Sequence, residues 1–355
     1  MPRIVTTEGR VYYRERRAAG GQDGGPRVLM LHGNVSSSLF YRPMLAEGLP
    51  PSWHVLAPDL RGYGESEARP IDSTLGVANW SRDLWAFLGT VGWDDRPFHL
   101  LGWSMGGGIA MRMAIEAAER LASLTLIAPL SPFGYGGTID VSGTPAFPDF
   151  AGSGGGMANR AFVSALATGD RGSGEASPRT VMRNFYVKPG FRPPPALEEE
   201  WVTSMLSTRT GDDYYPGTLI PSANWPGAAP GERGILNALS PKYVNLSDLA
   251  QIQSRPPILW LRGVHDAIVS DRSQLDLATV GAMGIVPGWP GAAIMPPQPM
   301  LVQTRAVLDA YAARGGTYHE ILFEHSGHSP HLEEPERFGG VFVPFIEDAQ
   351  HAVPG

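Results

Sequence analysis

The chain has 355 residues and a formal net charge of −7, with 43% hydrophobic and 18% charged residues. These values are typical of a globular protein with a sizeable core, as one large α/β domain with an insertion or two small domains. Because the chain is acidic and has no Lys/Arg run, we expect neither nucleic acid nor a membrane surface as a partner. The absence of cysteine excludes disulfides, thiolate metal ligands and a thiol nucleophile.

The N-terminal sequence carries no apolar stretch long enough for a signal peptide. No apolar run approaches the roughly 18 residues that a membrane-spanning helix requires. We therefore expect a cytoplasmic protein.

Short apolar or β-branched runs alternate with helical patterns along much of the chain. Six runs predict buried strands, at 28–33, 54–60, 98–104, 123–129, 257–263 and 318–324. Helical spacing of apolar residues predicts helices at 77–92, 107–121 and 301–316. This alternation is typical of an α/β fold with a mostly parallel central sheet flanked by helices.

The alternation stops between residues 131 and 255, which are rich in Gly, Pro and aromatic residues. A linker would not carry so many aromatic side chains, so we interpret 131–255 as an inserted cap domain and 1–130 with 256–355 as the core domain. The aromatic residues either form the core of the cap or line a roomy apolar pocket, and both interpretations stay open.

The stretch "GWSMG", Gly102 to Gly106, lies between a predicted strand and a predicted helix. A serine hydroxyl is a weak nucleophile, and a sharp strand-to-helix turn lifts it out of the packed interior. The backbone is crowded two residues before and two residues after the nucleophile, so glycine fits best at these positions, which here are Gly102 and Gly106. The pattern therefore predicts that Ser104 is a nucleophile, the alternative being a glycine-rich turn with a packing role only.

A serine nucleophile requires a base and an acid that orients the base. Asp266 follows the predicted strand 257–263, and His328 follows the predicted strand 318–324. Catalytic groups of parallel sheets gather at the carboxyl ends of strands, so both positions suit the roles. Asp271 is the main rival of Asp266, and His331 is the main rival of His328.

His325, His328 and His331 are spaced by three, which could indicate metal ligands. The segment is predicted as a loop and no carboxylate recurs at ligand spacing, so we expect no metal site. "GSGGG" at 152–156 follows no predicted strand, so it is not a dinucleotide fingerprint. We expect no cofactor.

Five motifs together resemble the α/β-hydrolase fold superfamily, in its cap-bearing branch of serine hydrolases such as esterases and lactonases. They are "LHGN" at 31–34, "PDLRGYGES" at 58–66, "GWSMGG" at 102–107, "LRGVHDAIV" at 261–269 and "SGHSPHLEEP" at 326–335. The resemblance covers about 1–130 and 255–350.

The resemblance implies that Ser104 attacks a carbonyl carbon, that His328 is the general base, and that Asp266 orients the imidazole. It implies that the backbone N–H groups of Asn34 and Met105 form the oxyanion hole. His32 is interpreted as a residue that shapes its loop, Asp59 and Arg61 as residues that stabilise a turn, and Glu333 and Glu334 as residues at the entrance of the last helix.

Candidate substrate-binding residues are Trp103, Val35, Tyr214 and Tyr215. Haloalkane dehalogenases and epoxide hydrolases carry an aspartate nucleophile at the strand-to-helix turn. The serine at position 104 therefore argues against Tyr214 and Tyr215 as residues that polarise an epoxide. The expected substrate is a small molecule, an apolar ester or lactone. Alternatives with the same triad are hydrolysis of C–C bonds, thioesters or amides and formation of peracids; a non-catalytic ligand receptor is a further alternative. Because a histidine base must be neutral, we expect activity to fall at acid pH.

Overall fold

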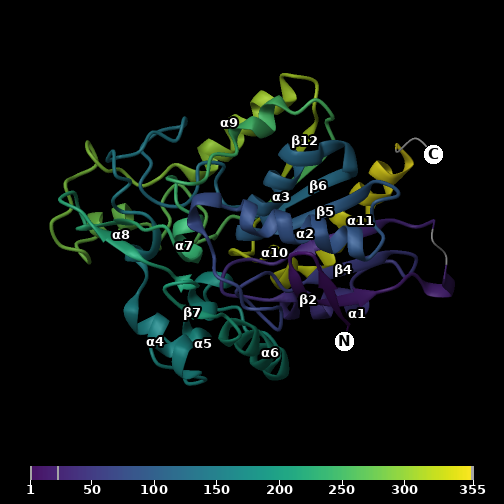
Figure 1. Cartoon of the computed structure of the whole chain (residues 1–355), viewed down its shortest axis with the longest axis horizontal. Coiled ribbons are helices and arrows are strands. Elements are labelled where there is room, and N and C mark those ends of the chain that lie inside the picture. Colours follow the sequence, from purple (N-terminus) through teal and green to yellow (C-terminus); the bar gives the residue numbers. More distant parts are fainter. Residues whose placement is uncertain (1, 22–23, 353–355) are drawn as a thin grey trace.

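The computed structural model describes residues 2–21 and 24–352, so positions 1, 22–23 and 353–355 of the predicted core domain lie outside the description. Eight strands form one sheet in the order β1-β2-β4-β3-β5-β6-β11-β12 (Figure 1). The strands from β4 to β12 are parallel, whereas β1 pairs with β2 and β2 with β4 in antiparallel fashion. Their bounds are β1 Arg3–Thr6, β2 Gly9–Arg16, β3 Arg27–Leu31, β4 His54–Pro58, β5 Phe98–Trp103, β6 Leu121–Ile127, β11 Ile258–Gly263 and β12 Tyr318–Phe323.

Each of the six predicted strands corresponds to one of these parallel strands, and the mostly parallel sheet is confirmed. The hairpin of β1 and β2 was not predicted. Its strands lie at the edge of the sheet and keep many exposed or half-buried polar side chains, so they lack the continuous apolar run of a central strand.

Helices cover both faces of the sheet. Phe98 and His99 are consecutive residues of β5 and so point to opposite faces. The Phe98 ring lies 6.2 Å from the ring of Trp85 in α2, whereas His99 hydrogen-bonds to Gln350 of α11 at 3.1 Å. The core helices are α1 Arg42–Glu47, α2 Ala78–Thr90, α3 Met105–Ala117, α8 Leu277–Ala282, α9 Met300–Ala312, α10 Pro330–Glu333 and α11 Pro335–His351.

Residues 131–255, between β6 and β11, fold into short elements that lie beyond one end of the sheet (Figure 1). Here they are called the intervening segment. Its buried aromatic side chains join the main hydrophobic cluster of the molecule. The elements are α4 Arg160–Thr168, α5 Pro178–Val181, η6 Met182–Tyr186, α6 Pro195–Leu206, β7 Thr210–Gly211, β8 Tyr215–Pro216, β9 Leu219–Pro221, β10 Ala228–Pro230 and α7 Ile235–Ala238, with the 3-10 turns η5 Gly154–Met157 and η7 Ser247–Gln251. A further 3-10 turn, η2 Ser38–Tyr41, lies outside this segment, after β3.

The helix α6 ties the intervening segment to the sheet. Trp201 of α6 stacks on Phe40 with ring centroids 5.6 Å apart and planes 7° apart. The hydroxyls of Ser37 and Ser204 lie 2.6 Å apart in a buried hydrogen bond. The intervening segment is thus packed directly onto the loop that follows β3.

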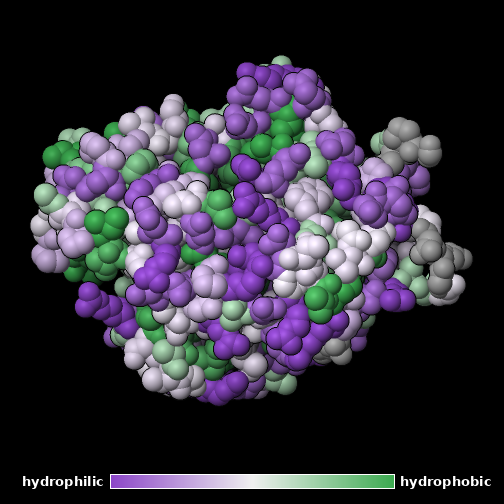
Figure 2. Space-filling model, in the orientation of Figure 1, coloured by the Kyte–Doolittle hydropathy of each residue, from purple (hydrophilic) through white to green (hydrophobic). Residues whose placement is uncertain are grey.

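The surface in the view of Figure 2 is mainly hydrophilic. Hydrophobic side chains gather at the end of the molecule where Figure 1 places α8, and the exposed ones just after that helix include Met283 and Ile285. No helix in the described part of the chain is both long and apolar enough to cross a bilayer.

Candidate active site

Ser104 occupies a tight turn between β5 and α3. Its backbone has φ 56° and ψ −120°, a conformation that is costly for a residue with a side chain. The surrounding packing enforces it, because a Cβ on Gly102 would lie 2.2 Å from the Gly106 carbonyl oxygen. A Cβ on Gly106 would lie 2.3 Å from the carbonyl oxygen of Leu31. The two glycines of the motif therefore let β5 and α3 approach closely, and the turn leaves Ser104 half-buried at the sheet edge.

Asp266 and His328 meet in a buried pair. The carboxylate oxygens of Asp266 lie 3.0 and 2.9 Å from His328 Nδ1, so this nitrogen donates its proton to the carboxylate. The carboxylate also accepts the backbone N–H groups of Ile268 at 2.8 Å and Val269 at 3.0 Å. These bonds fix the acid in place, and the acid in turn fixes the orientation of the imidazole, leaving Nε2 free for other partners.

The His328 loop is fastened to the serine turn through Trp103. The indole N–H of Trp103 donates to the His328 carbonyl oxygen at 3.0 Å, and the two rings lie 5.7 Å apart. Among the described residues, no hydrogen bond joins Ser104 to His328 itself. The structure thus pairs Asp266 directly with His328. Ser104 follows Trp103 in the chain, and the indole of Trp103 is hydrogen-bonded to the His328 backbone.

The loop after β3 lies against the serine turn, since a Cβ on Gly33 would lie 3.1 Å from Ser104 Cβ. His32 shapes this loop: its Nε2 accepts the Leu60 N–H at 2.9 Å, and its Nδ1 lies 2.9 Å from the Gly33 carbonyl oxygen. Burial lowers the pKa of His32 to about 4, so its imidazole is neutral at pH 7. This geometry agrees with the loop-shaping interpretation of His32.

The backbone N–H groups of Asn34 and Met105 were predicted to form the oxyanion hole. Met105 is the first residue of α3, where N–H groups have no partner within the helix and the helix dipole favours negative charge. Within the described structure, neither of these two N–H groups donates a hydrogen bond. The Asn34 side chain is occupied, because its Oδ1 accepts from Tyr63 Oη at 2.7 Å and from the Val35 N–H at 3.0 Å.

Tyr186, which the sequence did not indicate, contacts three parts of this site. Its hydroxyl donates to the Asn34 carbonyl oxygen at 2.7 Å. Its ring lies 5.8 Å from the Trp103 ring and 6.2 Å from the His328 ring. It comes from η6 of the intervening segment, so only tertiary structure brings it here.

The four candidate substrate-binding residues differ in their surroundings. Trp103 and Val35 are buried, with exposed fractions of 0% and 2%. Tyr215 is buried and its ring lies 6.2 Å from that of Phe162, whereas Tyr214 is half-buried.

The three histidines spaced by three do not form a cluster. His331 is buried in contact with aromatic rings, and neither of its ring nitrogens has a hydrogen-bond partner among residues 2–21 and 24–352. Burial lowers the pKa of His331 to about 3, and the nearby His328 contributes. Among the described residues, no group of three or more His, Cys, Asp or Glu is placed to hold a metal ion.

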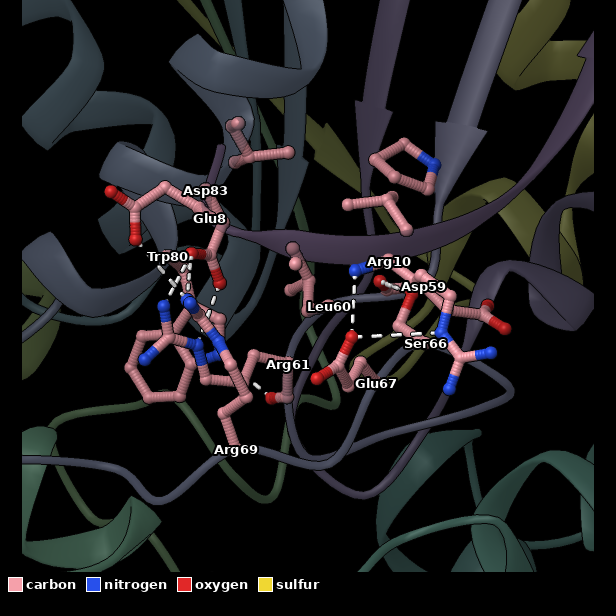
Figure 3. Close-up of a pocket in the computed structure, with 14 residues that line it drawn as sticks. Glu8, Arg10, Asp59, Leu60, Arg61, Ser66, Glu67, Arg69, Trp80 and Asp83 are labelled. Carbon is pink, nitrogen blue, oxygen red and sulfur yellow. Dashed lines mark hydrogen bonds and ion pairs between the residues drawn. The ribbon is translucent and has the colours of Figure 1, made fainter. Parts of the chain in front are cut away.

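A separate small pocket lies beside the N-terminal hairpin (Figure 3). Its polar side chains have partners within the pocket wall: Asp83 binds Arg61 and Arg69, and Glu67 accepts the backbone N–H of Arg10 at 2.9 Å. Neither Ser104 nor His328 lines this pocket. Asp59 on its wall accepts the backbone N–H groups of Ser38 and Glu65, as expected of a residue that stabilises a turn.

A family model described as "alpha/beta hydrolase fold" matches residues 26–153. The protein has the α/β-hydrolase fold. The monoacylglycerol lipase abhd6-B of Xenopus laevis is 32% identical over 112 residues, which are 32% of this chain and 33% of the lipase. The chain therefore matches only about a third of the length of such curated relatives.

Solved α/β-hydrolase structures cover nearly the whole chain at low identity, which shows the shared fold. An esterase from Exiguobacterium antarcticum has a TM-score of 0.58 and 14% identity, covering 97% of this chain and 98% of the esterase. The enol-lactonase from Burkholderia xenovorans LB400 has a TM-score of 0.57 and 16% identity, covering 98% of this chain and 100% of the lactonase.

The matched range of this chain includes Asn34 and Ser104 but neither Asp266 nor His328. The assignment of those two residues consequently depends on their own geometry and not on the family match.

Proposed function

We propose that this protein is a serine hydrolase that cleaves a carboxylic ester or lactone through an acyl-enzyme. The buried Asp266–His328 pair carries the proposal, because a carboxylate bonded to Nδ1 leaves Nε2 as a base. The strained backbone of Ser104 supports it, since such strain is maintained at functional sites. The esterase and the enol-lactonase with the same fold, and the monoacylglycerol lipase with local identity, favour an ester over other bonds.

In the proposed reaction the Ser104 oxygen attacks the carbonyl carbon while His328 Nε2 takes the hydroxyl proton. The oxyanion is stabilised by the N–H groups of Asn34 and Met105, and removal of one such donor typically costs about 10²- to 10³-fold in rate. His328 then gives its proton to the leaving alcohol as the C–O bond breaks. Water, deprotonated by the same imidazole, hydrolyses the acyl-enzyme and restores Ser104.

We further propose that residues 131–255 act as a cap. The supporting observation is Tyr186, which comes from this segment and contacts both Asn34 and His328. The substrate is then a small molecule that enters between the cap and the sheet edge.

A fluorophosphonate probe tests the proposal without knowledge of the natural substrate. We expect Ser104 to be labelled in the wild-type protein, and no labelling in Ser104→Ala. We expect Asp266→Asn to lower the rate constant for hydrolysis of p-nitrophenyl butyrate by about 10⁴-fold, because the imidazole loses its correct tautomer.

Asp271→Asn, on the rival acid, is the matched control and should keep most of the activity. Absence of labelling in the wild-type protein would contradict a nucleophilic Ser104. A panel of aryl esters, lactones, thioesters and amides then ranks the bond types by kcat/KM.

A further inference from the structure

Residues 186–188 of the intervening segment, here called the strap, run across the candidate site. The Tyr186 hydroxyl binds the Asn34 carbonyl oxygen at one end of the strap. Val187 is 1% exposed, so the strap is packed into the molecule and is not a surface loop. Lys188 lies at its other end, next to the loop that carries His328.

The strap touches the His328 loop at Gly327. A Cβ built on Gly327 would lie 2.7 Å from the Lys188 nitrogen and 2.9 Å from the Val187 carbonyl carbon. Both atoms belong to the backbone, so a side chain at residue 327 would push the strap away. The two chain segments therefore lie in backbone contact directly beside the imidazole.

Glu333 in α10 joins the two segments through both of its carboxylate oxygens. Oε1 accepts the backbone N–H of Lys188 at 2.5 Å, and Oε2 accepts the N–H of Gly327 at 2.8 Å. Oε2 also lies 3.4 Å from the N–H of Ser329. The N–H groups on either side of His328 are thus held by the same carboxylate that holds the strap.

Among the described residues Glu333 has no ion-pair partner, and the like charge that acts on it is the Asp266 carboxylate. The pKa of Glu333 is raised to about 7, chiefly because the group is buried; the three backbone N–H groups lower the pKa, and the Asp266 carboxylate adds to the rise. The other ionisable groups at this place are His328 on the same loop, Lys188 on the strap and Glu334, which follows in the chain and binds the Ser326 hydroxyl at 2.6 Å.

We propose that Glu333 is a positioning residue that clamps the strap to the His328 loop, so that cap seating and imidazole placement form one coupled arrangement. This inference rests on the proposed role of His328 as the base. A carboxyl side chain suits the task because its two oxygens accept from the two chain segments at the same time. The link through Glu333 is separate from the proposed triad of Ser104, Asp266 and His328 and from the proposed oxyanion hole.

Glu333→Gln tests the clamp, with Glu334→Gln as the matched control. The amide offers one acceptor oxygen in place of two, so at least one backbone N–H on the clamp meets an NH₂ group and loses its partner. We expect kcat for p-nitrophenyl butyrate to fall about 10- to 100-fold, as for a misplaced catalytic group, with KM changed less than about threefold. Glu334→Gln should stay within about twofold of the wild-type kcat.

Hydrogen exchange measured by mass spectrometry separates a clamp from a general loss of stability. In Glu333→Gln we expect faster exchange in peptides that contain 187–188 and 327–329 together, with other regions unchanged. In the wild-type protein, burial gives Glu333 a higher pKa in the packed state than in an opened state, so the same two peptides should gain protection together, beyond the intrinsic pH effect, as the pH falls from 8 to 6. This second measurement needs no variant.

A wild-type kcat in Glu333→Gln would contradict the proposed clamp. Hydrogen exchange that changes in the peptide containing 187–188 but not in the peptide containing 327–329, or the reverse, would also contradict it. If the wild-type Ser104 is not labelled by the fluorophosphonate, the proposed function fails instead, and the exchange measurement still decides whether the strap and the loop are coupled.

Discussion

At Ser104 the backbone is held in a conformation that typically costs about 1–3 kcal/mol, and adjacent glycines make this possible. A Cβ on Gly106 would lie 2.3 Å from the carbonyl oxygen of Leu31 and 2.6 Å from that of His32. Both obstacles are backbone atoms, one at the end of β3 and one in the loop that presents Asn34, so they cannot move without moving that loop.

We expect Gly106→Ala to destabilise the protein by roughly 2 kcal/mol or more, because overpacking against backbone forces the start of α3 to shift. Labelling of Ser104 by the fluorophosphonate should slow at least about tenfold, since a small displacement of a reacting group is costly. Urea unfolding and labelling kinetics measure the two effects.

Gly89→Ala is the matched control. Gly89 lies in α2, is exposed, and has no heavy atom within 4 Å of the site of a new Cβ. Alanine there should stabilise the protein by about 0.5–1 kcal/mol through helix propensity and leave labelling unchanged. Wild-type stability and labelling in Gly106→Ala would show that the close approach is not required.

The residues of the site could be predicted to different extents. Ser104, Asp266 and His328 each follow an apolar run that the sequence marks as a strand, so their common edge of the sheet could be inferred. The sequence placed Glu333 only at the entrance of the last helix and gave Tyr186 no role. The contacts of both with the backbone far away in the chain could not be predicted, because no spacing in the sequence encodes them.

At the scale of elements, the attachment of α6 decides how the intervening segment sits on the sheet. Trp201 is 1% exposed and stacks on Phe40, which in turn lies 5.3 Å from the Trp103 ring. A line of aromatic rings therefore runs from α6 to the serine turn. The indole nitrogen of Trp201 has no hydrogen-bond partner within the described part of the chain, so the contribution of Trp201 there is packing.

We expect Trp201→Ala to lower the free energy of unfolding by about 3–5 kcal/mol, the usual cost of truncating a buried aromatic residue. Limited proteolysis should then cut first between 131 and 255, because the segment loses its main anchor. Trp201→Phe keeps a ring on Phe40 and should cost less than about 1.5 kcal/mol. Equal losses in the two variants would mean that the stacked ring is not the anchor.

Sequence patterns succeed and fail here for identifiable reasons. The central strands of the parallel sheet are buried on both faces and so are visible as continuous apolar runs, as in β6 and β11. The path of residues 131–255 could not be predicted, because its two- and three-residue strands and one-turn helices, such as β9 and α7, are too short to establish a period. Its packing is decided by single aromatic contacts instead.

At the scale of the whole molecule, the fold buries three histidines in their neutral form. Burial lowers the pKa of His32 and of His99 to about 4 and that of His331 to about 3. In the unfolded chain each would gain a proton near pH 6.5. Their contribution to stability is therefore present above that pH and is lost as the pH falls toward the folded pKa values. Glu333 acts in the opposite sense, because its raised pKa makes the folded state bind a proton more readily.

The substitution His331→Phe removes the pH-dependent contribution of one of these three buried histidines. Phenylalanine suits the contacts with Tyr41, Trp103 and Phe338, and it removes two ring nitrogens that have no partner. At pH 7.5 we expect the variant to be as stable as the wild type or more stable by about 1 kcal/mol. Between pH 6.5 and 4.5 its advantage should grow, by at most about 1.4 kcal/mol per pH unit.

Urea unfolding at several pH values measures this difference. His319→Gln, on the exposed face of β12, is the control and should change stability by less than about 0.5 kcal/mol throughout. An advantage of His331→Phe that shrinks as the solution becomes more acidic would contradict a buried neutral imidazole.

The sheet order has a consequence for biosynthesis. In the finished molecule β6 is flanked by β5 and β11, but β11 is translated only after the whole intervening segment. While the ribosome makes those residues, β6 presents an open edge of a type that recruits other strands. The nascent chain thus spends a long interval exposed to aggregation, and a chaperone that shields this edge would be most useful before residue 258 emerges.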